Sequence, residues 1–167
     1  MPGQSRDTPP LILFNAAPPD AAQRTLLTCL HSHTWAERVA GHRPYPDVDA
    51  LLAASDEAAY DLSATDLAEA LAAESLPALP EDTYSAAHTA LDAAQAAYEA
   101  RFGHAFVIYL DETPPEEHLD RVLADIRSRL ANDPDDERQV AAEQLRRLAR
   151  SRLGSTLRGA GNCATSH

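Results

Sequence analysis

Apolar residues recur at intervals of three and four along most of the chain, the spacing that places side chains on one face of a helix. The clearest stripe consists of Leu119, Val122, Leu123, Ile126 and Leu130. Interior prolines fall between such segments or at their first position, as expected for residues that interrupt helices. The pattern predicts helices over residues 20–31, 34–41, 47–59, 63–74, 83–102, 115–131 and 134–153.

Several of these helix starts carry side chains that can accept hydrogen bonds from the first backbone N–H groups. The capping-box pattern is matched by Thr34 with Glu37, Ser63 with Asp66, and Thr113 with Glu116. We therefore expect an all-α, single-domain helical bundle over residues 11–153 with one short extended segment. A flexible arm is predicted at residues 1–10 and a disordered tail at residues 154–167.

One apolar run departs from helical spacing. Residues 106–110 read FVIYL and directly follow a helical pattern that ends at Phe102. Gly103 stands where a helix commonly ends with a left-handed residue. The run is too short for a buried helix, so an extended core segment is expected. Its backbone N–H and C=O groups, beside a helix end, form a plausible cradle for a small molecule.

Composition and charge exclude several classes of function. The chain has 167 residues and a formal net charge of −12, which disfavours binding to nucleic acid or to an anionic membrane surface. All of its basic residues other than histidine are arginines, so lysine Schiff-base chemistry is excluded. The sequence has no phosphate-binding glycine loop, no HExxH and no CxxC, and its two cysteines stand far apart. We therefore expect no cofactor and no metal. We also expect a cytoplasmic protein, because no leader-like or membrane-spanning run is present.

Two side chains are candidates for chemistry on the strength of their positions. His104 follows Gly103 and stands at the mouth of the predicted cradle, where it would act as an acid or base or merely cap the preceding helix. Arg152 continues the apolar stripe of Ala141 and Leu145 on the last helix. Its guanidinium either extends to solvent at the helix end or points into a pocket to hold a carboxylate or a urea-like carbonyl.

Three blocks of the sequence together resemble one enzyme family. They are residues 26–45, with a cysteine, a tryptophan-started helix and an Arg-Pro-Tyr turn; residues 95–108, with the FG turn and FVI run; and residues 126–153, with RL-N…E…RL. In order and spacing they resemble the 2-oxo-4-hydroxy-4-carboxy-5-ureidoimidazoline (OHCU) decarboxylase family, which forms allantoin at the end of urate breakdown. The resemblance implies an all-helical homodimer whose ligand lies against the backbone of Phe106, Val107 and Ile108 and beside Arg152.

The family's catalytic motifs are absent from the matching positions. By register Glu74 and Ser75 stand where the family has its essential His-Pro pair. The family's Ser-x-x-Glu-Gln element has no room, because Glu74 lies only 24 residues before Tyr98. The resemblance implies that the histidine of the His-Pro pair is the family's general acid–base catalyst and that the Glu and Gln orient it. The loss of these residues implies a rebuilt or inactive site.

Three interpretations remain open. The first is a diverged, lyase-type enzyme that acts on a small carboxylated or urea-like ring in purine catabolism or specialised biosynthesis, with His104 and Glu74 as candidate catalytic residues. The second is a small-molecule-binding or scaffold protein on the same fold. The third is an authentic OHCU decarboxylase. In each case the expected partners are a small molecule and a second copy of the chain.

Overall fold

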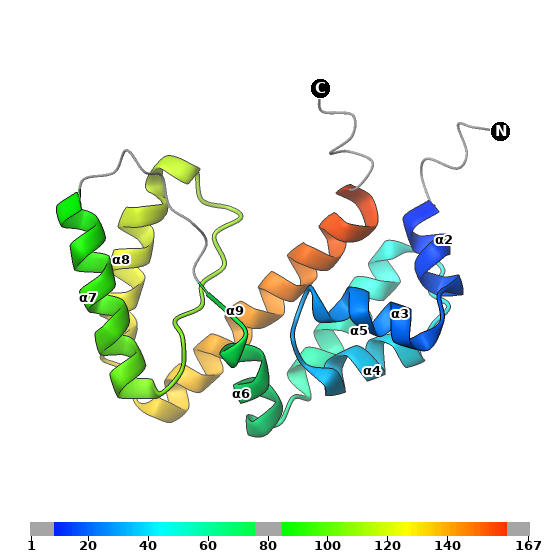
Figure 1. Ribbon diagram of the computed structural model, residues 1–167, viewed down its shortest axis with the longest axis horizontal. Helices are drawn as coiled ribbons and strands as arrows, with labels where there is room; N and C mark the ends of the chain where they lie inside the picture. Colours follow the sequence, from blue (N-terminus) through cyan, green and yellow to red (C-terminus); the bar gives the residue numbers. More distant parts are fainter. Residues whose placement is uncertain (1–8, 76–84, 160–167) are drawn as a thin grey trace. The chain divides into compact units, whose positions relative to one another are not determined.

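The computed structural model describes residues 9–75 and 85–159, and most of these residues are helical (Figure 1). No strand is assigned within these two ranges, so the predicted all-α class is confirmed. The chain divides into two compact units. The first unit runs to Leu67 and resumes at Arg146, and the second runs from Ala68 to Leu145. Each unit is described separately below.

The first unit is built around Trp35. Its elements are α2 (Pro9–Ala16), α3 (Pro19–Leu27), α4 (His33–Gly41), α5 (Val48–Tyr60) and the end of α9 (Pro134–Gly154). It also includes the first turn of α6 (Ala64–Ala72), most of which belongs to the second unit. Helix α4 packs against both α3 and α5. The Trp35 ring is fully buried, and its Nε1–H donates to the carbonyl of Ser55 on α5 at 3.1 Å. The tryptophan therefore joins two helices of this unit through both packing and a hydrogen bond.

Helix α2 was not predicted, since the sequence PPLILFNA shows no helical alternation of apolar and polar residues. Contacts distant in sequence hold it in place. Asn15 exchanges two hydrogen bonds with the backbone of Tyr45, at 3.0 and 2.9 Å. Arg43 donates to the carbonyl of Phe14 at 2.7 Å, and the ring of Phe14 is buried. Tertiary contacts thus stabilise a helix whose own sequence gives little signal, and the helix begins two residues before the predicted end of the arm.

The C-terminal tail also begins later than predicted. Helix α9 continues to Gly154 and is followed by a π-helical turn, η2 (Ser155–Gly159), which packs against α2. The reason is a single apolar side chain, Leu157, which is buried although its neighbours in sequence are polar. One isolated leucine gives no periodicity, so the sequence could not reveal this turn. The rest of the predicted tail lies outside the described residues.

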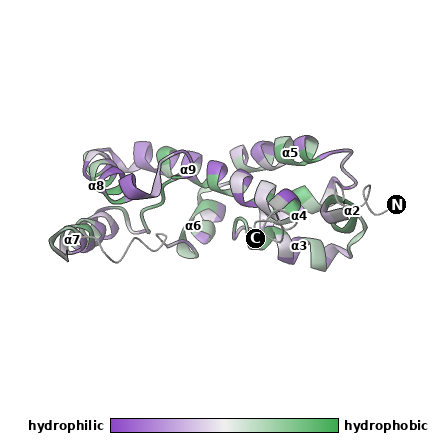
Figure 2. Cartoon of the chain, turned by 90° about the horizontal axis from the view of Figure 1, so that it is seen from above, coloured by the Kyte–Doolittle hydropathy of each residue, from purple (hydrophilic) through white to green (hydrophobic). Residues whose placement is uncertain are grey.

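The second unit pairs α7 (Ser85–Phe102) with α8 (His118–Arg129), which is preceded by the 3₁₀ turn η1 (Pro115–Glu117). Helix α8 carries both apolar and polar residues (Figure 2), and its buried residues include Leu119, Val122 and Ile126 of the predicted stripe. The apolar faces of both helices enclose one cluster, formed by Leu91, Tyr98, Phe106, Ile108, Leu110, Leu119, Val122 and Ile126. Gly103 ends α7 with φ of 79°, and its N–H bonds the carbonyl of Glu99 at 2.8 Å, which confirms the predicted left-handed helix end.

The predicted capping boxes had different outcomes. Ser63 and Asp66 form a reciprocal box, with each backbone N–H bonded to the other side chain at 3.3 and 3.1 Å. At α4 the prediction was wrong, because the cap is Ser32, whose hydroxyl accepts from the N–H of Trp35 at 3.2 Å. The box predicted at Thr113 was also wrong. Two consecutive prolines begin a 3₁₀ turn there without a side-chain cap.

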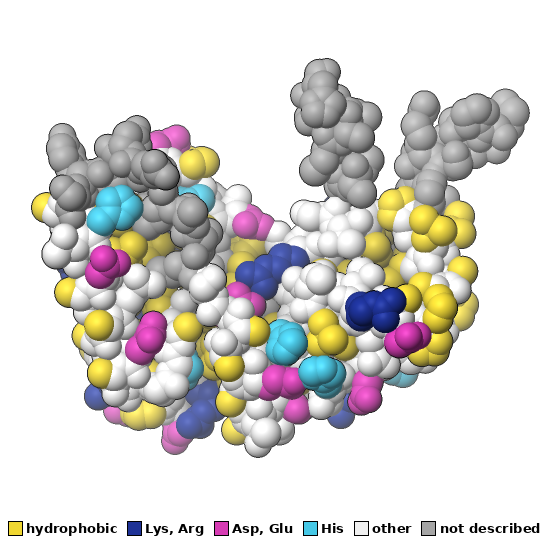
Figure 3. All heavy atoms as spheres, viewed as in Figure 1, with side chains coloured by type: hydrophobic (Ala, Val, Ile, Leu, Met, Phe, Trp, Pro, Cys, Tyr) yellow, Lys and Arg dark blue, Asp and Glu magenta, His cyan; other side chains and the backbone are white. Residues whose placement is uncertain are grey.

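Surface properties of the described residues agree with the composition. On the face seen in Figure 3, acidic and arginine side chains are interspersed. Among the described residues, no helix combines the length and the apolar character that crossing a bilayer requires.

Candidate functional site

Residues 106–110, called here the extended segment, follow α7 in the second unit. The side chains of Phe106, Ile108 and Leu110 enter the α7–α8 cluster, whereas Val107 and Tyr109 do not belong to it. Side chains that alternate with a period of two identify an extended backbone. In such a backbone the N–H and C=O groups of alternate residues also point to opposite edges. The segment therefore has two distinct polar edges.

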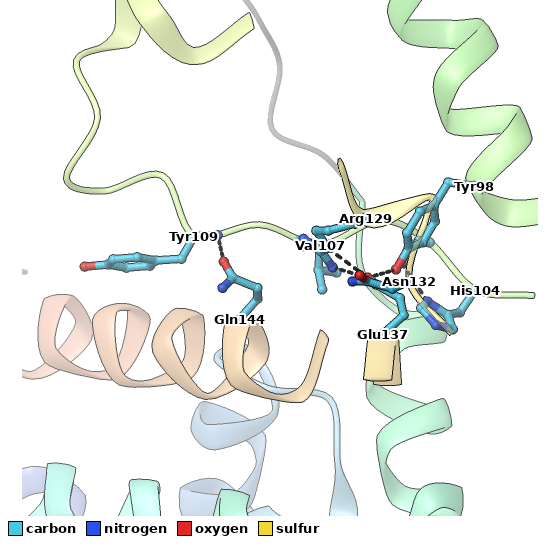
Figure 4. A network of polar contacts seen from close by, with 9 residues as sticks. Tyr98, His104, Val107, Tyr109, Arg129, Asn132, Glu137 and Gln144 are labelled. Carbon is cyan, nitrogen blue, oxygen red and sulfur yellow. Dashed lines mark hydrogen bonds and ion pairs between the residues drawn. The ribbon is translucent and has the colours of Figure 1, made fainter. Parts of the chain in front are cut away.

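One edge is held by two helices, and is called the anchored edge. The carbonyl of Val107 accepts a hydrogen bond from Nη1 of Arg129, the last residue of α8, at 2.7 Å. The N–H of Tyr109 donates to Oε1 of Gln144 on α9 at 2.8 Å (Figure 4). Val107 and Tyr109 are two residues apart, so their backbone groups share an edge, as the alternation requires.

The opposite edge, called the open edge, consists of the backbone N–H and C=O groups of Phe106 and Ile108. Both side chains are buried. Within the described ranges, no hydrogen bond reaches the backbone groups of either residue. Buried backbone polar groups nearly always have a partner, so groups left without one in the protein are suited to a ligand or to water. The carbonyl of Val107, the third predicted ligand contact, is bound to Arg129 on the anchored edge, and the contact of Val107 with a ligand stays a prediction.

Behind the anchored edge lies a network of four side chains, three of them buried and Asn132 half-buried, called the anchoring network. Glu137, which is fully buried, accepts from Nε and Nη2 of Arg129 at 2.8 and 2.6 Å through one carboxylate oxygen. The Tyr98 hydroxyl donates to the same oxygen, and Nδ2 of Asn132 donates to the other at 3.0 Å. Arg129 is only 7% exposed. The charges of Arg129 and Glu137 cancel, and the remaining hydrogen-bonding groups of the carboxylate are satisfied, as a buried ion pair requires.

Of the two charged residues in this network, the sequence carried a signal for Arg129 but not for Glu137. Arg129 stands three residues after Ile126 and seven after Val122, so it continues the apolar stripe of α8 just as Arg152 continues that of α9. Glu137 gave no such signal, because it follows two exposed aspartates, Asp135 and Asp136, in the first turn of α9. Acidic residues are common in that position because they favour the helix dipole. Burial alone distinguishes Glu137 from its neighbours.

Burial affects the acidity of two tyrosines. The pKa of the Tyr98 phenol lies well above its ordinary value, first because of burial and second because of its hydrogen bond to Glu137. Burial likewise raises the pKa of Tyr45 to about 12, and its hydroxyl donates to the carbonyl of Val39 at 2.7 Å. Both phenols are therefore neutral hydrogen-bond donors throughout the physiological range of pH.

These shifts predict a dependence of stability on alkaline pH. A phenol whose pKa is raised on folding contributes stability that is complete below the unfolded pKa of about 10 and is lost as the pH rises further. We expect unfolding to become easier above about pH 10, and Tyr45 and Tyr98 to form phenolate only after exposed tyrosines have done so. Absorbance titration of the wild type, Tyr45→Phe and Tyr98→Phe measures this. Loss of an early-titrating group in either variant would contradict the assignment.

His104 lies at the start of the extended segment, half-buried between aromatic rings. Its ring meets that of Tyr98 edge-on at 5.5 Å and stacks on that of Phe102 at 6.2 Å. Nδ1 lies 3.0 Å from the carbonyl oxygen of Ala105, the next residue, so this nitrogen contacts the segment after the histidine and not the preceding helix. A carbonyl only accepts, so the neutral ring carries its hydrogen on Nδ1 and leaves the lone pair on Nε2. This tautomer suits a base, while the role itself stays a prediction.

The other predicted site residues occupy different places. Glu74 follows α6 in the second unit, half-buried, and its N–H bonds the carbonyl of Leu71 at 3.2 Å. Arg152 lies in the first unit, where Nη1 donates to the carbonyl of Cys29 at 3.1 Å. Burial raises the pKa of the Cys29 thiol, which disfavours a reactive thiolate there. The catalytic role of Glu74 and the ligand contact of Arg152 stay predictions.

The chain is similar to one protein family and to several solved structures, two of which are given below. The model of the OHCU decarboxylase family matches residues 15–82 and 78–154, in two pieces that meet where the sequence lacks room for Ser-x-x-Glu-Gln. The crystal structure of an (S)-allantoin synthase has a TM-score of 0.70 and 22% identity, covering 88% of this chain and 53% of that one. An OHCU decarboxylase crystallised in the presence of (S)-allantoin has a TM-score of 0.66 and 19% identity, covering 80% and 96%.

At such identities the two solved structures show a shared fold alone. The chain spans about half the length, 53%, of the allantoin synthase. No curated protein matches the sequence.

Proposed function

The chain belongs to the OHCU decarboxylase family, and from this premise we propose that it is a diverged member that binds a small ureide-like ring at the open edge. Members of this family and its structural neighbours include enzymes. The proposed ligand carries an amide-type N–H and C=O side by side. A carboxylate on the same ring would supply the leaving group for lyase-type chemistry.

The observation that carries the proposal is the edge of Phe106 and Ile108, whose backbone groups have no hydrogen-bond partner in the part of the chain that the structure describes. In an extended backbone the N–H and C=O of one residue lie next to each other on one edge, which is how an added strand is recognised. A hydantoin, a ureide or an imidazolinone presents the complementary pair of groups within a single ring. One structural neighbour was solved in the presence of (S)-allantoin, a ring of this chemical class.

Proton transfer is assigned to His104, with Glu74 as the second candidate. The lone pair on Nε2 of His104 is available, because Nδ1 is taken up by the carbonyl of Ala105. Only one residue, Ala105, separates His104 from the first residue of the open edge, Phe106. Histidine is the side chain most often used for proton transfer in general acid–base catalysis.

Binding without chemistry is the alternative, and the sequence at one position favours it. Glu74 and Ser75 replace the His-Pro pair that the family resemblance places there. A protein that kept the open edge but lost this pair would bind ureide rings without turning them over. Comparison of ligand binding with turnover on the same preparation separates the two functions.

We expect (S)-allantoin and hydantoin carboxylates to raise the melting temperature, because a ligand of the native state stabilises it by about 2.7 kcal/mol at a hundred times Kd. Analogues methylated on the ring nitrogens serve as controls, since they keep the shape of the ring but lose its N–H donors. The proposal predicts a smaller rise with these analogues. It is contradicted if no ureide shifts the melting temperature, or if methylated and unmethylated rings act equally.

Arg152→Ala is expected to weaken the binding of a carboxylated ring about tenfold to a hundredfold, the effect of losing one charge-assisted contact. Arg152→Lys is expected to restore little, because an ammonium cannot form a planar fork. Arg150→Ala is the control, since this half-exposed arginine pairs with Asp56 at 2.7 Å. Isothermal titration measures all three variants. An equal loss in Arg150→Ala would show that Arg152 is a surface cation only.

We also propose that the protein forms a homodimer, as the family resemblance implies. Light scattering at micromolar concentration should give twice the 18.0 kDa mass of the chain. A mass equal to that of one chain would contradict this.

A further inference from the structure

The geometry points to Arg129 as a positioning residue: held in one orientation by Glu137, it binds the carbonyl of Val107 and thereby fixes which edge of the extended segment is open. The use of that edge for a ligand rests on the proposed function. The fixing of the edge is a property of the protein alone, so it can be tested without any ligand.

The donors of the Arg129 guanidinium are divided between two tasks. Nε and Nη2 both bond the Glu137 carboxylate, at 2.8 and 2.6 Å, while Nη1 bonds the carbonyl of Val107 at 2.7 Å. The guanidinium is planar and rigid, so fixing one side of it fixes the direction of the other. Glu137 thus determines where Nη1 points, and through Nη1 it determines the orientation of the Val107 peptide group.

Glu137 is itself held from three directions. Besides Arg129, its carboxylate accepts from the hydroxyl of Tyr98 on α7 and from Nδ2 of Asn132, which lies 3.0 Å away in the turn before α9 (Figure 4). Helices α7, α8 and α9 therefore each contribute to the orientation of one carboxylate. A functional group is placed accurately when its supporting residues are themselves fixed by packing and hydrogen bonds.

The same guanidinium also contacts a side chain of the open-edge residues. Its Cζ atom lies 4.3 Å from the centroid of the Phe106 ring. Arg129 therefore touches the segment twice, at the Val107 carbonyl and at the ring of the preceding residue. Rotation of the segment by one residue would break both contacts at once, because the side chains and the backbone groups alternate together.

A contribution to stability alone does not explain why the charged pair of Arg129 and Glu137 is buried. Well-packed apolar side chains of similar volume are often as stabilising as a buried ion pair. The buried pair of Arg129 and Glu137 nevertheless lies against Tyr98 and Phe106, two members of the apolar cluster. What an apolar pair could not provide is the bond to the Val107 carbonyl, and hence a fixed orientation of the backbone.

The test is amide hydrogen exchange, measured by NMR on the full chain without ligand. Arg129→Lys keeps the positive charge beside Glu137 but cannot reach Glu137 and Val107 with one planar group. The N–H of Tyr109 is the reporter, because its own partner, Gln144, is unchanged. We expect exchange at Tyr109 to accelerate about tenfold, the effect of losing one hydrogen bond from a locally opening segment. Amides in the middle of α7 and α8 should keep their wild-type rates.

Two further variants complete the test. Arg127→Lys, an exposed arginine on the same helix, is the matched control and should leave Tyr109 at its wild-type rate. If Arg129→Lys does not fold, Glu137→Gln is measured instead, because it keeps the shape of the acceptor while weakening its hold on Arg129. The proposal is overturned if exchange at Tyr109 stays at the wild-type rate, or if it rises only together with the amides of α7 and α8.

Isothermal titration with (S)-allantoin then links the position of the edge to binding. Arg129→Lys should raise Kd about tenfold, whereas Arg127→Lys, which leaves the bond between Arg129 and Val107 in place, should change it less than twofold. Equal losses in the two variants would overturn the positioning role. Failure of the wild type to bind would contradict the proposed function and leave the exchange result to decide the role of Arg129.

Discussion

Replacement of Glu137 by alanine is expected to lower the free energy of unfolding by about 3–5 kcal/mol, the effect of removing one partner of a buried ion pair. The change leaves the guanidinium of Arg129, only 7% exposed, without its carboxylate. It also removes the acceptor of the Tyr98 hydroxyl and of the Asn132 amide. Urea denaturation followed by circular dichroism measures the difference.

Asp136→Ala is the matched control for this prediction. Asp136 precedes Glu137 in the first turn of α9 and is exposed, so its loss removes only a favourable interaction with the helix dipole, about 0.3–1 kcal/mol. Glu137→Gln should fall between the two, because the amide keeps one oxygen as an acceptor. If Glu137→Ala cost no more than Asp136→Ala, the anchoring network would have no structural importance.

The second large effect concerns catalysis. Supplied with freshly prepared OHCU, the protein is expected to decarboxylate it at the rate of buffer, or about 10²–10⁴-fold more slowly than a family member that has its acid–base histidine. The reason is that Glu74 and Ser75 occupy the register of the family's His-Pro pair, and that the Glu-Gln pair which orients the histidine has no counterpart. Turnover is measured as the loss of substrate absorbance against a buffer blank.

The double variant Glu74→His with Ser75→Pro tests whether the missing histidine alone accounts for the low rate. It restores the histidine without restoring the residues that orient it, and residues that act as a unit give little when one is present alone. We therefore expect only a small gain in rate. Turnover of about 10 per second by the unchanged chain, an ordinary enzyme rate, would show that the catalytic residues have been assigned to the wrong positions.

Much of the fold could be predicted from local sequence. The stripe from Leu119 to Leu130 gave α8, the reciprocal box of Ser63 and Asp66 gave the start of α6, and Gly103 gave the end of α7. These features depend on residues close together in sequence. Helix α2 and the turn η2 depend instead on contacts with distant segments, such as that of Asn15 with Tyr45, so their sequences gave no comparable signal.

The candidate site could be predicted only in part, for a related reason. The position of residues 106–110 followed from a break in helical periodicity, and the structure adds that only Phe106 and Ile108 form the open edge. This division depends on side chains from α8 and α9. Arg129 could have been found, because it continues an apolar stripe, whereas Glu137 is distinguished from neighbouring acidic residues only by its burial.

The most direct test of the account is an NMR titration of the labelled protein with (S)-allantoin, followed at the backbone amides of the extended segment. If the open edge binds the ring, the N–H resonances of Phe106 and Ile108 should shift most, downfield, as they become hydrogen-bond donors. The N–H of Tyr109 should shift least, because it already donates to Gln144 at 2.8 Å. Saturable shifts at other residues with Phe106 and Ile108 unmoved, or largest shifts at Tyr109, would contradict the account.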